Sequence, residues 1–219
     1  MVCETERKAA PLMRYLVVGG HARGIGKTAL VVDVIRAFPE AGWTAVKISP
    51  HGHGAWPGPG EPREGGAAGA AALLEEETEC RGRSDSSRYL AAGALRSFWL
   101  RTRQGHLAAG LAKLEKALRG DENLIIESNA VLEVVRPQLC LMVLDPSVSE
   151  FKESARRWLG CADAFVTRGP LKGVCWQGVS DQIPESKPVF EQRMGEPLPE
   201  GLLVLIRNRL FTSVHPPTT

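Results

Sequence analysis

The sequence predicts an α/β fold, with a doubly wound, mostly parallel sheet flanked by helices. Short apolar runs that end in glycine or in an acidic residue are typical of buried parallel strands, and they alternate with segments of helical period. The clearest helix is predicted at 104–119, where Leu107, Leu111, Leu114 and Leu118 share one face and charged residues face water. A chain of 219 residues, 43% of them hydrophobic, fits one domain spanning 1–219.

The remaining elements follow in order along the chain. Strands are predicted at 15–18, 43–48, 97–101, 124–126, 139–144, 164–167, 188–190 and 202–206, and further helices at 27–38, 67–76, 85–94 and 151–159. The first strand runs into Gly19 and Gly20, as a buried strand does before a tight turn. An insertion is predicted at about 50–84, beginning with a surface loop at 50–66 that is crowded with Gly, Pro and His.

Composition excludes several classes of function. The chain has 27 basic and 25 acidic side chains, and a net charge of +2 is too weak a field to indicate nucleic acid or an anionic membrane as partner. The five cysteines are widely spaced and form no C-x-x-C pair, which favours a reducing compartment. No stretch approaches the roughly 20 apolar residues needed to cross a bilayer. We therefore expect a soluble, cytoplasmic protein.

A glycine-rich turn lies between the first strand and the first helix, which is the context of a phosphate-binding P-loop. Its main-chain N–H groups and the helix N-terminus are suited to phosphate oxygens. The predicted nucleotide-binding residues are His21, Ala22, Arg23, Gly24, Ile25, Gly26, Lys27, Thr28 and Ala29. Lys27 is expected to contact the β and γ phosphates as a catalytic residue, and the Thr28 hydroxyl to bind Mg²⁺.

The loop departs from the strict P-loop pattern at one position. His21 stands where that pattern has its first glycine, and Gly20 comes one residue too early. The side chains of His21 and Arg23 could add phosphate contacts or could point into solvent. The alternative to a P-loop is an ordinary glycine-rich turn with an exposed lysine.

Acidic residues end two of the predicted strands. Glu127 follows three aliphatic residues and is predicted to be catalytic and to hold a Mg²⁺-bound water, the Walker B role, although it could simply cap a turn. Asp145 is predicted to have a turn or N-cap role. Asp85 could be an N-cap, or a second Mg²⁺ or substrate contact. His51 and His53 are expected to be solvent-facing loop residues, with metal or anionic substrate as the alternative.

From Arg14 to Asp145 the order of motifs resembles the MobB-type molybdopterin-guanine dinucleotide biosynthesis adapters, of the SIMIBI class of P-loop GTPases. The resemblance rests on the loop up to Thr28, on Lys47 followed by a histidine-bearing stretch, on Asp85-Ser86 followed by Ala92-Gly93-Ala94, and on Glu127. It implies binding of GTP and Mg²⁺, slow hydrolysis at most, homodimerisation, and assistance to the nucleotidyltransferase that attaches GMP to molybdopterin.

The choice between GTP and ATP stays open, because no Asn-Lys-x-Asp motif is present and 167–169 holds the place of a base-reading loop. The leading hypothesis is a nucleotide-binding adapter with weak GTPase activity in molybdenum cofactor biosynthesis. The first alternative is an ATP-dependent small-molecule kinase or a dethiobiotin-synthetase-like ligase, with its substrate under the loop at 51–85. The second is a scaffold whose P-loop binds nothing.

Overall fold

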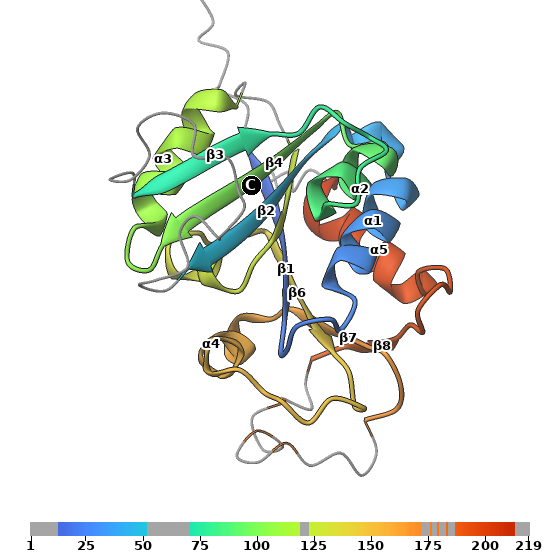
Figure 1. Ribbon diagram of the computed structural model, residues 1–219. Coiled ribbons are helices and arrows are strands. Elements are labelled where there is room, and N and C mark those ends of the chain that lie inside the picture. The colour runs from blue at the N-terminus through green and yellow to red at the C-terminus, as the bar shows by residue number, and fades with distance from the viewer. Residues whose placement is uncertain are drawn as a thin grey trace, which may run out of the picture.

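One eight-stranded sheet forms the centre of the protein. The computed structural model describes residues 13–51, 71–118, 123–171 and 187–212, together with Trp176, Val179 and Ile183. Within these residues the strands are β1 (Arg14–Gly20), β2 (Trp43–His51), β3 (Ala72–Glu76), β4 (Arg96–Arg103), β5 (Asn123–Glu127), β6 (Leu139–Leu144), β7 (Ala164–Thr167) and β8 (Val189–Glu191). Their order is β3-β4-β2-β5-β1-β6-β7-β8, and every pair is parallel except β3 with β4 (Figure 1).

Helices cover both faces of this sheet, as the sequence predicts. They are α1 (Lys27–Ala37), α2 (Asp85–Ala91), α3 (Leu107–Ala117), α4 (Glu153–Trp158) and α5 (Glu200–Leu210). The apolar residues of α1, α2 and α5 pack on one face, while those of α3 and α4 pack in clusters on the other. Figure 1 shows α1, α2 and α5 together on one side of the strands. This is a doubly wound α/β arrangement.

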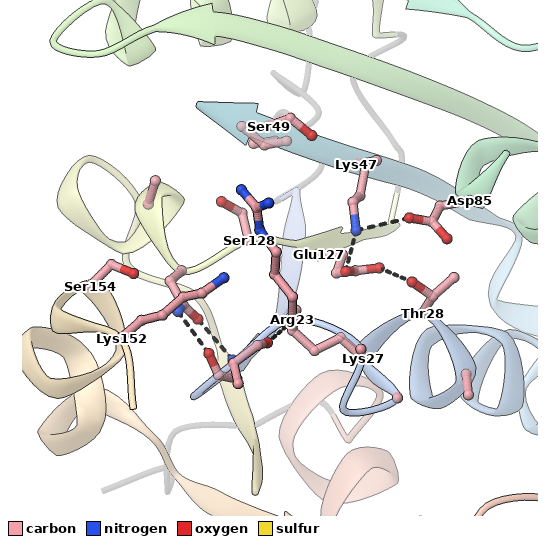
Figure 2. A pocket seen from close by; sticks show the side chains of 18 of the residues that line it. Arg23, Lys27, Thr28, Lys47, Ser49, Asp85, Glu127, Ser128, Lys152 and Ser154 are labelled. Carbon is pink, nitrogen blue, oxygen red and sulfur yellow. Dashed lines mark hydrogen bonds and ion pairs between the residues drawn. The ribbon is translucent and has the colours of Figure 1, made fainter. Parts of the chain in front are cut away.

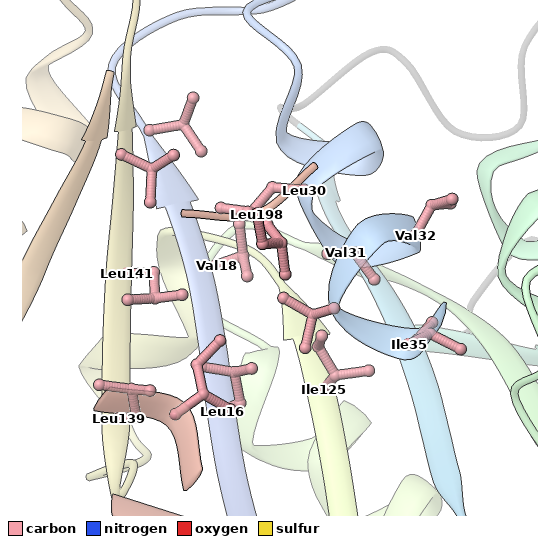
Figure 3. Packing of buried hydrophobic residues seen from close by; sticks show 14 of the residues in the cluster. Leu16, Val18, Leu30, Val31, Val32, Ile35, Ile125, Leu139, Leu141 and Leu198 are labelled. Carbon is pink, nitrogen blue, oxygen red and sulfur yellow. The ribbon is translucent and has the colours of Figure 1, made fainter. Parts of the chain in front are cut away.

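The central strand β1 is buried on both faces because its side chains alternate between the two layers. Leu16 and Val18 pack in the cluster under α1, and Val17 packs in the cluster under α3. Leu30 and Val31 of α1 are fully buried against this strand and its neighbours (Figure 3). Burial of such a side chain stabilises the fold by about 1.5–3 kcal/mol. The start of α1 is therefore held firmly against the end of β1.

The expected helix at 67–76 is wrong for the residues that the structure describes. Residues 72–76 form the edge strand β3, antiparallel to β4, and 52–70 lie outside the described part of the chain. The Ala, Leu and Glu of this segment are good helix formers, but tertiary pairing overrides that preference. Arg96 binds Glu76 at 2.7 Å and Arg101 binds Glu75 at 2.6 Å, so β4 provides cross-strand partners for the acids of β3.

The expected strand at 202–206 is also wrong, because these residues belong to helix α5. A continuous apolar run was the basis of that prediction, and such a run is ambiguous between a strand and a helix. Leu202, Ile206 and Leu210 are buried at a spacing of four residues, while Val204 is 43% exposed. The helical period is visible only when the segment is extended to Leu210.

No helix in the described residues is both long enough and apolar enough to span a membrane.

Candidate functional site

The turn between β1 and α1 adopts a conformation that two glycines make possible. Gly24 and Gly26 have φ values of 72° and 87°, in the left-handed region that other residues rarely adopt. Gly26 is the N-cap of α1, and no side chain caps this helix end. The N–H groups of the first helical turn have no partner within the helix. They are therefore available to an anion at the place where the sequence predicts phosphates.

Lys27 lies over this turn. Its ammonium donates a hydrogen bond of 2.6 Å to the Ala22 carbonyl at the other end of the loop. Burial lowers its pKa, opposed by the charge of Glu127, so the protonated form lacks some of its usual solvation. Lys27 lines a pocket of about 670 Å³ together with Gly24, Gly26 and Thr28 (Figure 2). A polyphosphate bound in this pocket would give the Lys27 ammonium a negatively charged partner in place of the neutral Ala22 carbonyl.

Arg168, which follows β7, holds the outer side of the same turn. Its guanidinium donates to the carbonyls of Gly26 at 2.7 Å and Ile25 at 3.3 Å. In a trans peptide the C=O and the following N–H point in opposite directions, so these contacts turn the N–H groups of Gly26 and Lys27 away from Arg168. Arg168 lies in the segment expected to read a base, and the structure shows its guanidinium bound to the loop main chain instead. The sequence alone does not reveal this contact.

Glu127, at the end of β5, is the most engaged acid of the site. Its side chain is 2% exposed, and its oxygens accept hydrogen bonds from the Thr28 hydroxyl at 2.8 Å, the Tyr89 hydroxyl at 2.5 Å and the Lys47 ammonium. Burial and the negative charge of Glu127 raise the pKa of Tyr89 well above 10.0. The structure thus brings together Thr28 and Glu127, the hydroxyl and the carboxylate that the sequence predicts at a Mg²⁺ site.

Lys47 lies between two carboxylates. Its ammonium contacts Glu127 and also Asp85, the latter at 3.0 Å (Figure 2). Arg88 reaches the other oxygen of Asp85 at 3.7 Å. Lys47 pairs in register with Glu127 on the neighbouring strand. Lys47 is a charged residue between the apolar residues Val46 and Ile48, and this interruption of the strand is the sequence signal that could have marked it as a site residue. The carboxylates of Asp85 and Glu127 therefore face the same position, and the Lys47 ammonium occupies it.

Asp85 is not the N-cap of α2. Ser84 is the N-cap, and its hydroxyl accepts from the Ser87 N–H at 3.0 Å. Asp85 is the first residue of the helix, where its carboxylate is turned to Lys47 and lines the pocket. Asp145 has the expected turn role, because its carboxylate accepts from the N–H and the hydroxyl of Ser147 at 2.9 and 2.6 Å.

The side chain of His21 is buried in the core, so the expectation of a solvent-facing side chain and that of a phosphate-contacting side chain are both wrong. His21 is fully buried, and its ring lies against Phe151 and Trp176, with centroids 5.1 and 5.0 Å apart. The Asp145 N–H donates to Nε2 at 3.0 Å, so Nδ1 carries the proton and donates to the Glu150 carbonyl at 2.7 Å. Burial lowers the pKa of His21. An imidazole ring can stand at this position, where the P-loop pattern has glycine, because the ring packs in the core against Phe151 and Trp176 and stays out of the loop.

Asn129 holds the end of β1 with two hydrogen bonds to one residue. Its Oδ1 accepts from the Gly20 N–H at 2.8 Å, and its Nδ2 donates to the Gly20 carbonyl at 2.9 Å. A Cβ added at Gly19 would lie 2.6 Å from the same Oδ1. This close approach explains the glycine at position 19. Asn129, Tyr89 and Lys47 are site residues to which the sequence analysis assigned no role.

Arg23 and Lys152 extend the positive charge beyond Lys27. Both line the pocket on the side away from Asp85, and Figure 2 shows their side chains near Ser128 and Ser154. Burial, and then the neighbouring charge of Arg23, lower the pKa of Lys152. Within the described ranges no salt bridge joins either residue to an acid. This side of the pocket is suited to an anion.

The roles expected for His51 and His53 fall on side chains that lie outside the described part of the chain. His51 is the last residue of β2, and its side chain and the whole of His53 lie outside the described part of the chain. Among the residues that the structure describes, no three His, Cys, Asp or Glu side chains come together as a metal site.

This chain is similar to solved structures at low sequence identity. No family model and no curated protein matches it. LpxK from Aquifex aeolicus, in a crystal structure with ATP, aligns at 16% identity and a TM-score of 0.44 over 82% of this chain and 53% of its own. HypB from Helicobacter pylori, in complex with nickel, aligns at 14% identity and a TM-score of 0.46 over 90% and 87%. The chain therefore spans about half the length of LpxK. The description of its fold rests on its own strand order and on the loop between β1 and α1.

Proposed function

We propose that this protein binds a Mg²⁺–nucleoside triphosphate at the loop 21–29. The observation that carries the proposal is the 2.8 Å contact between the Thr28 hydroxyl and the buried Glu127 carboxylate, in the pocket that Lys27 and the left-handed glycines line. Hydroxyl and carboxylate oxygens are ligands of the kind that Mg²⁺ prefers, and unpaired N–H groups at a helix N-terminus suit phosphate.

The residues of the pocket have separate roles in this proposal. Lys27 exchanges the Ala22 carbonyl for phosphate oxygens, and the N–H groups of the loop hold the α and β phosphates. Thr28, Glu127 and Asp85 fit the metal, because the two carboxylates already face one cation, the Lys47 ammonium. Bound Mg²⁺ supplies positive charge to the terminal phosphates. Ala22, Arg23, Ile25 and Ala29 contribute main-chain groups, and Arg23 adds its guanidinium.

The finer proposal is an adapter with weak GTPase activity in the biosynthesis of molybdopterin guanine dinucleotide. The motif order from Arg14 to Asp145 supports it, as do the contacts of Glu127. Three donors engage the two oxygens of this carboxylate, which suits orientation of a metal-bound water more than removal of a proton. Slow hydrolysis follows from that arrangement. A molybdopterin nucleotidyltransferase and a second copy of the chain are the partners proposed with this role, in the cytoplasm.

A second candidate is an ATP-dependent kinase or ligase that acts on a small molecule. The observation that favours it is the positive charge at Arg23 and Lys152, on the side of the pocket away from the proposed metal ligands. The three phosphates of a nucleotide can be neutralised by Lys27, Mg²⁺ and main-chain N–H groups. The additional cations then suit an anionic second substrate.

Isothermal titration calorimetry with GTP, ATP and their diphosphates, with and without Mg²⁺, tests the proposal. We expect Mg²⁺-dependent triphosphate binding that weakens by about 2 kcal/mol or more, roughly 30-fold, in Lys27→Ala, because a charge-assisted contact is lost. Lys116→Ala, an exposed lysine of α3, is the matched control and should bind as the wild type does. Unchanged affinity in Lys27→Ala would refute the site. A preference for GTP favours the adapter, and a preference for ATP favours the enzyme.

A further inference from the structure

A second cavity, of about 310 Å³, opens beside the phosphate pocket. It is lined by Lys47, Ser49, Arg83, Ser84, Asp85, Ser86 and Trp99. Three of these residues, Lys47, Ser49 and Asp85, also line the phosphate pocket, so the two cavities meet at the Lys47–Asp85 ion pair. The volume is at the lower end of the range for small-molecule sites. None of the roles proposed for the nucleotide uses Trp99 or Arg83.

The floor of this cavity is built on one face of the sheet. In the parallel pair β2–β4, Lys47 lies opposite Trp99, and Ser49 opposite Arg101. Residues two apart on a strand share a face, so these four side chains form one group. Their face is that of α1 and α2, because the intervening Ile48 and Leu100 pack in the cluster under α3.

The Trp99 indole is held in place before any ligand arrives. Its Nε1 donates a hydrogen bond of 3.1 Å to the Ser49 hydroxyl. The Arg101 guanidinium lies 4.5 Å from the centroid of the ring and is fixed by Glu75 at 2.6 Å. An aromatic surface that is ordered in advance loses little conformational entropy when it binds a ligand.

The wall of the cavity is also ordered. The Glu77 carboxylate accepts from the N–H groups of Thr78 and Glu79 at 3.1 and 3.0 Å, and from the hydroxyls of Ser84 and Ser86 at 2.8 and 3.0 Å. These bonds close the segment 77–86 on itself. Arg83 lies within that segment and is exposed, and in the described residues no acid forms a salt bridge with it.

We propose that this cavity, defined by Trp99, Arg83 and Lys47, binds a small aromatic or heteroaromatic molecule that carries an anionic group. The ring packs against the Trp99 indole, which favours flat aromatic partners. The anionic group lies at Arg83, which forms no salt bridge with an acid in the described residues. Binding at this cavity does not require a nucleotide, and only its position beside the phosphates of a nucleotide rests on the proposed function.

The test uses indole-3-carboxylate as probe, with indole and cyclohexanecarboxylate as comparators, each titrated calorimetrically into the full chain. We expect indole-3-carboxylate to bind at least ~10-fold more tightly than indole, which lacks the charge, and than cyclohexanecarboxylate, which lacks the aromatic ring. Equal binding of all three, or binding of none, would overturn the proposal.

Two variants locate the binding. Trp99→Leu and Arg83→Ala should each weaken indole-3-carboxylate at least ~10-fold. Arg83 is exposed, so Arg83→Ala tests the site without disturbing the core, and Arg81→Ala, an exposed arginine of the same segment outside the cavity, is its control. Undiminished affinity in Arg83→Ala would overturn the proposal. Nucleotide affinity should be equal in Arg83→Ala and wild type, so failure of the aromatic site and failure of the nucleotide site are measured separately.

Discussion

Replacement of Tyr89 by phenylalanine tests the structure of the site without any ligand. The Tyr89 hydroxyl donates at 2.5 Å to Glu127, whose side chain is 2% exposed. A hydrogen bond to a buried charged group contributes about 1.5–3 kcal/mol. Phenylalanine retains the ring packing, and Thr28 and Lys47 remain as donors to the carboxylate. We therefore expect Tyr89→Phe to lower the free energy of unfolding by about 2 kcal/mol.

Urea unfolding at neutral pH measures this change as a shift in midpoint with an unchanged m-value. The control is Tyr15→Phe, because the Tyr15 hydroxyl donates to the Met13 sulfur at 3.8 Å, and a thioether is a weak acceptor. Its effect should be below about 0.5 kcal/mol. A loss below the same value in Tyr89→Phe would refute the reasoning, because the hydroxyl would then make no charge-assisted bond.

The buried Tyr89 hydroxyl should also make the free energy of unfolding depend on pH in the alkaline range. Burial and Glu127 raise the pKa of Tyr89 above its ordinary value of 10.0 in the folded state. Above that pH the unfolded chain loses the proton and the folded chain keeps it, so the free energy of unfolding falls as pH rises. This part of the slope should be absent in Tyr89→Phe. An identical alkaline slope in wild type and variant would contradict the placement of Tyr89.

Three further predictions concern single residues. Since burial holds the pKa of His21 below 6.5, the unfolded state binds the extra proton first, and stability should fall as pH decreases below that value. The fall should be smaller in His21→Gln, but not in the exposed control His106→Gln, when urea midpoints are compared across that range. Asn129→Ala should lower the free energy of unfolding by about 1–3 kcal/mol, because two bonds to Gly20 are lost, and should weaken triphosphate binding; unchanged stability and affinity would contradict this. For Glu127→Gln we expect triphosphate hydrolysis, measured as phosphate release, to fall while binding is largely kept, and equal turnover would remove Glu127 from the metal site.

Local patterns predicted the part of the fold in which neighbouring residues determine the outcome. The strand before Gly19, the turn to Gly26 and helix α1 are each specified by residues within one segment, and the structure confirms them. Residues 72–76, the described part of the helix expected at 67–76, and residues 202–206 were assigned wrongly, because their local composition does not decide between a strand and a helix. Residues 72–76 form a strand because they pair with β4, and residues 202–206 are helical because Leu202, Ile206 and Leu210, each four residues apart, are buried on one helix face.

The candidate site divides in the same way. Thr28 and Glu127 could be predicted because each has a recognisable position relative to a strand end or a helix start. Tyr89, Asn129 and Arg168 could not, because each acts through a contact with a residue more than 30 positions away in sequence. Tyr89 follows Asp85 by one helical turn, which is the local sign that Asp85 and Tyr89 both contact the Lys47–Glu127 ion pair.

The most direct test of the central claim is a crystal structure of the chain with Mg²⁺ and a non-hydrolysable analogue of GTP or ATP. We predict phosphate oxygens at the N–H groups of Gly24 to Thr28, with the Lys27 ammonium moved from the Ala22 carbonyl to the phosphates. A structure in which the analogue binds elsewhere, or in which Lys27 still bridges the loop to Ala22 at saturating nucleotide, would contradict it.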